Sequence, residues 1–249
     1  MTTQAKMATG AYVLYNGTVY AELTEVSPPS FSVEKVDATS HDSTHKVSIA
    51  GQTSFGDLTF KANFVNDTAQ AALRVLALAK TVGTWQFVYP TTSGLPTYSV
   101  PGFVSSLSYT SALKGTPAGM SCSITPTETV TEVTTAGNPL TTAFFTIDDE
   151  HATDISAFIS PAAAATTYSY DVAMPADNTG ITIKPVATTG TIYVDGTIVA
   201  TGVDSGAIGY AVADYPAGAI KTVFIVVTGT SKKPILYRIR LIRGITNHA

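Results

Sequence analysis

The chain has 249 residues, of which 45% are hydrophobic and 13% charged, and its formal net charge at pH 7 is −4. This length favours two domains, each able to bury its own core. The longest apolar runs are too short to cross a bilayer, and the scarcity of clustered lysine and arginine argues against stable binding to nucleic acid.

The N-terminal residues lack the apolar core of a secretory signal, so we expect the protein to be made and used in the cytosol.

The first elements of the chain are expected to be strands. Asn16 and Gly17 lie between β-branched and aromatic residues, which predicts a type I′ hairpin turn. Residues 31–36 and 56–64 both alternate, and a polar loop at about 37–47 separates them. We therefore predict two long strands joined by this loop.

The second of these strands has one apolar and one polar face. Leu58, Phe60 and Ala62 are expected to pack in the core. The polar residues of the two strands are expected to share one exposed surface; they are Ser32, Glu34, Asp57, Thr59, Lys61 and Asn63. In this register Glu34 would neutralise Lys61 across the strands.

A helix is predicted at about 67–80, in the stretch "NDTAQAALRVLALAK". Asp67 is placed as its N-cap and Gln70 three residues later, as in a capping box. Apolar side chains spread around most of the helix, among them Leu73, Val75, Leu76 and Leu78. Such a helix should be covered on two sides, by its own sheet and by something else, such as a neighbouring subunit.

Residues 137–142 look like a linker, because the surrounding sequence is rich in Thr, Gly, Asn and Pro. We expect one domain at 1–136 and a second at 143–249. The second half has short strands at regular spacing and a tight turn at Asp195 and Gly196, which predicts a β-sandwich. The fold class is thus mainly β, with one flanking helix in the first domain.

No catalytic, cofactor or metal motif is present. There is no Gly-rich phosphate loop, nucleophile elbow or zinc-protease signature, and the acidic stretch 148–154 lacks the glycine of a calcium loop. His41 and His45 are a weak metal pair because they lie in a non-helical loop. The single cysteine, Cys122, suits a packing role better than a nucleophile. We predict no enzymatic activity and no cofactor.

Residues 11–133 resemble the tail tube protein of lambda-type long-tailed phages. The resemblance rests on "SPPSFSVEKV", a polar loop, the run from "GQTSFGDLTFKANF" through the helix to "TWQFVYP", and "PGFVSSLSYTSALKGTPAGMSCSIT". It implies a β-sandwich or barrel with one helix, assembled into stacked hexameric rings. The tube would carry double-stranded DNA without binding it, inside a virion assembled in the host cytoplasm.

The same resemblance assigns roles to residues and partners. The long hairpin loop would reach the next ring, with Asp37, His41, Asp42, His45 and Lys46 as its contact residues. The two long strands would line the lumen, and their polar faces are assigned to it because a DNA conduit should be neutral or acidic inside. The helix would pack between its sheet and a neighbouring subunit. Expected partners are the chain itself and the tape measure, tail terminator and tail-tip proteins; no membrane is implied.

The second half resembles the cadherin-like or immunoglobulin-like sandwich modules added to bacterial and phage surface proteins, through "YSYDVAMPADNTGITIKPVA", "IYVDGT" and "TVFIVVTGTSKKPILYRIRL". Calcium-binding cadherin motifs are absent. Two alternatives remain open: an adhesin-type module, which predicts an exposed aromatic platform, and an enzyme acting on surface polymers, for which no carboxylate pair stands out.

Overall fold

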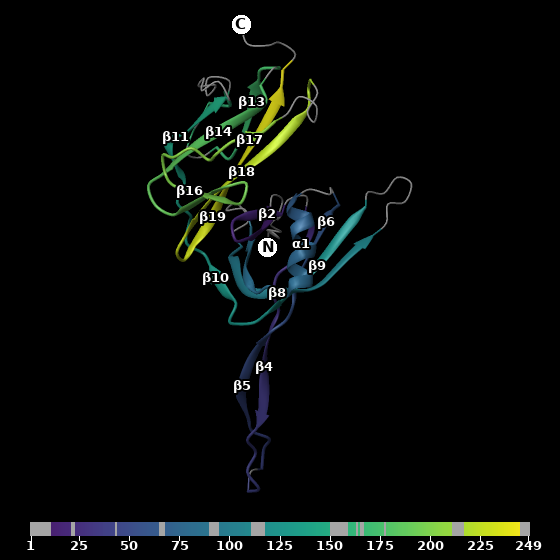
Figure 1. Ribbon diagram of the computed structural model, residues 1–249. Coiled ribbons are helices and arrows are strands. Elements are labelled where there is room, and N and C mark those ends of the chain that lie inside the picture. The colour runs from purple at the N-terminus through teal and green to yellow at the C-terminus, as the bar shows by residue number, and fades with distance from the viewer. Residues whose placement is uncertain are drawn as a thin grey trace, which may run out of the picture. The chain divides into compact units, whose positions relative to one another are not determined.

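The computed structural model of the chain describes residues 11–20, 23–42, 44–64, 68–89, 95–110, 118–149, 159–162, 164, 167–176, 178–210 and 217–244, with backbone only for 142–149 (Figure 1). The chain divides into two compact units that meet in sequence after Glu132, with Asn16–Val19 grouped with the second. Both are built from β-strands, and α1 (Thr68–Ala79) is the one helix among the described residues. The prediction of a mainly β protein with one helix is confirmed.

The first unit is organised around an eight-stranded sheet. Its strands are β1 (Tyr12–Tyr15), β2 (Thr18–Tyr20), β3 (Leu23–Ser27), β6 (Leu58–Asn63), β7 (Gly83–Val88), β8 (Thr97–Thr110), β9 (Gly119–Pro126) and β10 (Thr131–Val133). The order is β2-β1-β7-β8-β9-β6-β3, with β10 beside β8. Asn16 and Gly17 both have positive φ, as the predicted type I′ turn between β1 and β2 requires.

The long strand β8 joins the two parts of this sheet. Residues up to Gly102 pair with β7, and residues from Gly102 onward pair with β9. Gly102 is required by close approach, because a Cβ there would lie 2.6 Å from the carbonyl oxygen of Thr125. The buried Trp85 indole donates a hydrogen bond to the Gly102 carbonyl oxygen over 3.2 Å. The fold therefore depends on a glycine at this position.

The core of the first unit lies between the sheet and α1. Leu58, Phe60 and Ala62 are buried there, as their alternation predicted. Aromatic rings form its centre, with Trp85 4.5 Å from Tyr15 between ring centroids. These packed rings supply the apolar area that a sheet with one solvated face needs.

Helix α1 ends in a Schellman motif. Lys80 adopts a left-handed φ of 52°, its N–H donates to the Ala77 carbonyl, and the Thr81 N–H donates to the Leu76 carbonyl. At the other end Gln70 donates its side-chain amide to the Asn63 carbonyl oxygen over 2.8 Å. The predicted N-cap, Asp67, lies outside the described residues.

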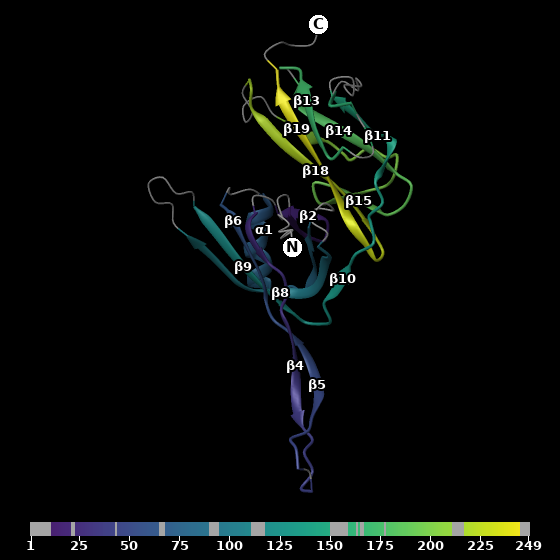
Figure 2. The ribbon, with the colours of Figure 1, turned by 180° about the vertical axis from the view of Figure 1, so that it is seen from behind.

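The strand pairing predicted for residues 31–64 is wrong. β4 (Phe31–Asp37) pairs with β5 (Ser48–Phe55), and the two form a separate two-stranded sheet. The expected partner of β4, the strand β6, instead pairs with β3 and β9. We call β4 and β5 with their connecting loop the ribbon; Figures 1 and 2 both show it standing apart from the strands of the eight-stranded sheet.

A β-bulge makes β5 difficult to recognise from the periodicity of its sequence. The register slips between Val33 and Lys35, so that Glu34 is opposite two β5 residues, Gly51 and Gln52, one more than in a regular ladder. This extra residue breaks the two-residue repeat by which a strand is recognised in sequence.

The second unit has two sheets over one core. The three-stranded sheet has the order β11 (Leu140–Asp149), β14 (Gly180–Ala187), β17 (Ile208–Gly209). The six-stranded sheet has the order β12 (Ile159–Ser160), β13 (Ser169–Met174), β19 (Lys232–Arg243), β18 (Ile220–Gly229), β15 (Thr191–Val194), β16 (Thr197–Val199). Side chains from both sheets share one buried cluster, which makes this unit a β-sandwich. Asp195 and Gly196 form the expected turn with positive φ at both positions.

The residues expected to form a linker, 137–142, are held within the second unit. Leu140 begins β11, is buried, and donates its N–H to the Tyr237 hydroxyl over 2.9 Å. Asn138 accepts a hydrogen bond from Lys232 and donates one to Thr189. The composition predicted a linker here, but a segment with polar side chains can belong to a domain when those side chains are hydrogen-bonded within it.

Candidate functional site

One face of the eight-stranded sheet is mainly polar over four neighbouring strands, β8, β9, β6 and β3. Opposite the core-facing residues of β6, β8 and β9, the exposed or half-buried side chains are mainly small and hydroxylic. We call this surface the polar face; its polar residues are Glu25, Ser27, Asp57, Thr59, Lys61, Asn63, Ser106, Ser108, Ser121, Ser123 and Thr125. The half-buried Phe103, opposite Thr125, lies on the same face. Serine and threonine hydroxyls hydrate well without presenting charge.

The charges on the polar face are few and largely satisfied. Lys61 Nζ lies 2.7 Å from Glu25 Oε2, its cross-strand partner on β3. The expected partner, Glu34, belongs to the ribbon, because β4 does not pair with β6. Both Lys61 and Glu25 side chains are about half exposed, so their pairing stabilises the fold only slightly.

Asp57 is fixed by hydroxyl donors from β9. Thr125 Oγ1 donates to Asp57 Oδ1 over 2.8 Å, and Ser123 Oγ donates to Oδ2 over 3.2 Å. The polar face thus carries two carboxylates and one ammonium group, all with partners.

The residues predicted to line one surface divide between two sheets. Asp57, Thr59, Lys61 and Asn63 lie on the polar face, whereas Ser32 and Glu34 share one face of the ribbon. Ser32 and Ser54 confirm this placement through a 2.8 Å hydrogen bond between their hydroxyls.

The loop at the end of the ribbon is tied together at its base. Thr39 donates from both its N–H and its hydroxyl to Asp37 Oδ1, and the Val47 N–H donates to Thr39 Oγ1. The Thr39 hydroxyl, followed by its N–H and by Lys46, lowers the pKa of Asp37. Lys46 Nζ is 3.6 Å from Asp37 Oδ2.

Beyond this base the predicted contact residues are exposed. His41 Nδ1 lies 3.7 Å from Asp42 Oδ1, and both side chains are fully exposed. His45 Nδ1 contacts the Thr44 carbonyl at 2.8 Å. Within the described part of the chain, no group of three or more His, Cys, Asp or Glu side chains gathers as a metal site would need.

The ribbon exposes apolar side chains on both faces. Phe31 is 73% exposed and Ile49 55%, and Val33, Val36 and Val47 are also exposed. Sequence reasoning missed this surface because exposed and buried apolar residues alternate identically along a strand.

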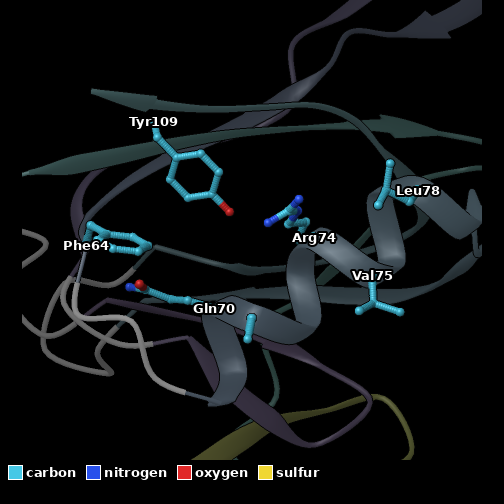
Figure 3. A pocket seen from close by; sticks show the side chains of 7 residues that line it. Phe64, Gln70, Arg74, Val75, Leu78 and Tyr109 are labelled. Atoms are coloured by element: carbon cyan, nitrogen blue, oxygen red, sulfur yellow. The ribbon is translucent and has the colours of Figure 1, made fainter. Parts of the chain in front are cut away.

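Helix α1 buries one side and exposes the other. Leu73 is fully buried and Leu76 packs against the same core, whereas Val75 and Leu78 are 65% and 76% exposed. An open groove of about 640 Å³ runs beside the exposed side and is lined by Phe64, Gln70, Ala71, Arg74, Val75, Leu78 and Tyr109. In Figure 3, Arg74 extends from α1 toward Tyr109, and Gln70 toward Phe64.

The wall of the groove opposite the helix is aromatic. Phe64 and Tyr109 meet edge to face with ring centroids 5.4 Å apart, and both are partly exposed. Arg74 is the one charged side chain in the lining, and it makes no hydrogen bond or ion pair with any described residue. We call this site the α1 groove.

Cys122 and Trp85, which could suggest catalysis or sugar binding, are buried in the core of the first unit. Burial raises the pKa of the Cys122 thiol to about 12, so the thiolate needed for nucleophilic attack is scarce at neutral pH. Trp85 is buried in the first unit and is not available to stack on a sugar. The predicted acidic loop at 148–154 lies outside the described side chains.

No described helix is long and apolar enough to cross a membrane. Three surfaces stand out among the described residues: the polar face, the ribbon and the α1 groove.

No protein-family model matches the chain, and no curated protein matches it either. Among solved structures, the chain is similar to one in the virion of a native gene transfer agent particle, with 17% identity and a TM-score of 0.44, covering 51% of this chain and 98% of the other. It is also similar to a chain in the tail of an empty gene transfer agent particle of C6 symmetry, with 18% identity and a TM-score of 0.41, covering 49% and 92%.

A third similar structure is the sheath and tube terminator of an extracellular contractile injection system. Identity is 13% and the TM-score 0.43, covering 53% of this chain and 99% of that one.

Proposed function

We propose that the chain is a structural, non-enzymatic subunit that assembles into stacked hexameric rings and forms the tail tube of a phage-like particle. The observation that carries the proposal is the ribbon, which exposes Phe31, Val33 and Ile49. An isolated two-stranded sheet is only marginally stable in water. A ribbon that also exposes apolar side chains gains stability when another molecule covers it.

Self-association explains why such a surface is retained. Open strand edges and apolar patches are a liability in a monomer but become contact surfaces in an oligomer. The exposed side of α1, with Val75 and Leu78, is a second surface of this kind on the same unit. Two distinct apolar surfaces on one chain suit a repeating assembly better than a single isolated dimer contact.

The polar face suits the lining of a DNA conduit. Duplex DNA carries one negative charge per roughly 1.7 Å, and rings of inward lysines would hold it by releasing counterions. The polar face offers one lysine, Lys61, already paired with Glu25, among Ser and Thr hydroxyls. DNA would pass along such a surface without stable binding. This supports the polar face as the lumen side, with Ser32 and Glu34 assigned to the ribbon instead.

The remaining parts of the proposal follow the resemblance in sequence. The loop carrying His41, Asp42 and His45 would contact the next ring, and the second unit would lie outside the tube. Tape measure, tail terminator and tail-tip proteins are the expected partners in a virion assembled in the host cytoplasm.

Electron microscopy with sedimentation velocity tests the proposal. We expect the purified chain at high concentration to form rings or tubes with a regular axial repeat. Replacing Val36 and Ile49 together by serine should shift it to monomers, because the ribbon loses exposed apolar area that drives association.

Ile198→Ser is the matched control, since Ile198 is exposed on β16 of the second unit. It should leave assembly unchanged. A wild-type chain that stays monomeric at every concentration, alone and with preformed tail-tip complexes, would contradict the proposal.

A further inference from the structure

The two faces of the ribbon differ in charge. Glu34 and Val36 lie on the same face of β4, and Ile49 is the cross-strand partner of Val36. The other face carries Phe31 and Val33, followed by Lys35. One ribbon face therefore combines two exposed aliphatic side chains with a carboxylate. The other combines apolar side chains with Lys35 and with Asp37, whose carboxylate is already paired with Lys46.

Glu34 has no hydrogen bond or ion pair with another described side chain. A glycine next to it, Gly51, keeps the face open, because a Cβ there would lie 3.1 Å from Glu34 Oε2 and 2.9 Å from Val36 Cγ2. Glu34 and Val36 thus both adjoin Gly51, and the Glu34 carboxylate is available to a partner.

The α1 groove has the complementary features. Its walls are apolar or aromatic, with Val75 and Leu78 on one side and Phe64 and Tyr109 on the other (Figure 3). Its one charged side chain, Arg74, is unpaired among the described residues. An apolar groove with a single guanidinium suits an apolar segment that brings one carboxylate.

We propose that the α1 groove of one copy of this chain binds the Val36 and Ile49 face of another copy's ribbon, with Glu34 paired to Arg74. The proposal rests on the proposed function and specifies the contact through which the subunits join. The opposite ribbon face is disfavoured, because Lys35 would be brought toward Arg74 and like charges repel.

This contact is heterologous, because a ribbon meets a groove and not another ribbon. An open series of such contacts keeps one free ribbon at one end and one free groove at the other until it closes. Such a contact builds a ring when the rotation between copies closes and a filament when it does not.

Charge reversal tests the pairing. Glu34→Arg or Arg74→Glu alone should raise the concentration for half-maximal assembly, measured by light scattering, at least about tenfold, because a desolvated like-charge contact replaces an ion pair. The double variant Glu34→Arg with Arg74→Glu should return to within about threefold of wild type. Lys35→Glu is the control on the other ribbon face and should have little effect.

Disulfide trapping tests the geometry without requiring tubes. The native Cys122 is buried and does not compete. Chains carrying Ile49→Cys mixed with chains carrying Leu78→Cys should form a disulfide-linked heterodimer under mild oxidation, while each variant alone should not. Linkage of the Ile49→Cys variant to itself would show a ribbon-to-ribbon contact and overturn the proposal.

The two hypotheses fail in different ways. Tubes that form normally with Glu34→Arg and give no heterodimer would overturn the docking proposal alone. A trapped heterodimer without rings or tubes would retain the docking contact and contradict the tail tube function.

Discussion

The ribbon and the β18–β19 hairpin are both pairs of long antiparallel strands, but they are stabilised in opposite ways. β18 and β19 lie inside a six-stranded sheet, and side chains such as Ile225 and Ile239 are fully buried. On the ribbon, Phe31 and Ile49 remain largely exposed. Backbone pairing is present in both, so the difference lies in packing against a second layer. The hairpin obtains that layer from its own unit, whereas we propose that another molecule supplies it to the ribbon.

The largest effect should come from truncating the same residue type in each region. Ile225→Ala should destabilise the second unit by about 2–5 kcal/mol, because it leaves a cavity in a closed core. Ile49→Ala should change the unfolding free energy of the monomer by less than about 0.5 kcal/mol, because its side chain is mostly hydrated already.

Urea unfolding of both variants at concentrations below assembly measures the two costs. Assembly should respond in the reverse order, with Ile49→Ala weakening it and the folded fraction of Ile225→Ala assembling normally. Equal unfolding costs for the two variants would remove the contrast between the regions.

A smaller effect is expected in the pH dependence of stability, which should differ in sign between Asp195, next to β18, and Asp37 on the ribbon. Burial raises the pKa of Asp195, although its Oδ1 accepts the Phe224 N–H over 2.8 Å and Lys221 lies near enough to oppose the shift. A raised folded-state pKa disfavours folding above about 3.8, the ordinary value of the group. Asp195→Asn should therefore stabilise the protein at pH 7, and its advantage should shrink as the pH falls toward 4.

Asp37 should behave in the opposite sense. Its pKa is lowered, chiefly by the Thr39 hydroxyl, so its contribution is present above the unfolded-state pKa and is lost as the pH falls through the folded value. Asp37→Asn should speed hydrogen exchange at the Val47 amide at pH 7 and should have less effect at low pH. NMR titration of both carboxyl groups checks the directions, and shifts of the same sign would contradict the assignment.

The smallest effect concerns the exposed pair on the polar face. A double-mutant cycle replacing Lys61 and Glu25 by glutamine should give a coupling energy of about 0.2–1 kcal/mol, as exposed ion pairs do. The same cycle for Lys61 and Glu34 should give no measurable coupling, because these residues lie on different sheets. Urea unfolding at low salt measures both cycles, and a larger Glu34 coupling would restore the strand pairing first predicted.

Local patterns were sufficient for several elements of the fold. Asn16 with Gly17 was predicted as a type I′ turn and Asp195 with Gly196 as a tight turn, and both pairs have the positive φ angles that a type I′ turn requires. The helix was predicted within about a residue of its described ends, and the alternation of β6 identified Leu58, Phe60 and Ala62 as core residues. Each of these features depends only on residues that are close together in the sequence.

Pairings between distant segments required the structure. The bulge opposite Glu34 concealed β5, so β4 was assigned to the wrong partner and Lys61 was paired with Glu34 instead of Glu25. Leu140 was predicted to belong to a linker. Its burial depends on packing in a core shared with Tyr237, which lies about a hundred residues away in the sequence.

By itself the sequence determined the mainly β class, the tight turns, the one described helix and the polar side of β6, because these follow from backbone preferences and side-chain periodicity over a few residues. Only the tertiary structure decided that β4 and β5 form a separate ribbon, and that Val75 and Leu78 border a groove with Phe64 and Tyr109. The physical reason is that exposure and register are properties of segments brought together from far apart in the chain, and one residue of slip moves a side chain to the other face.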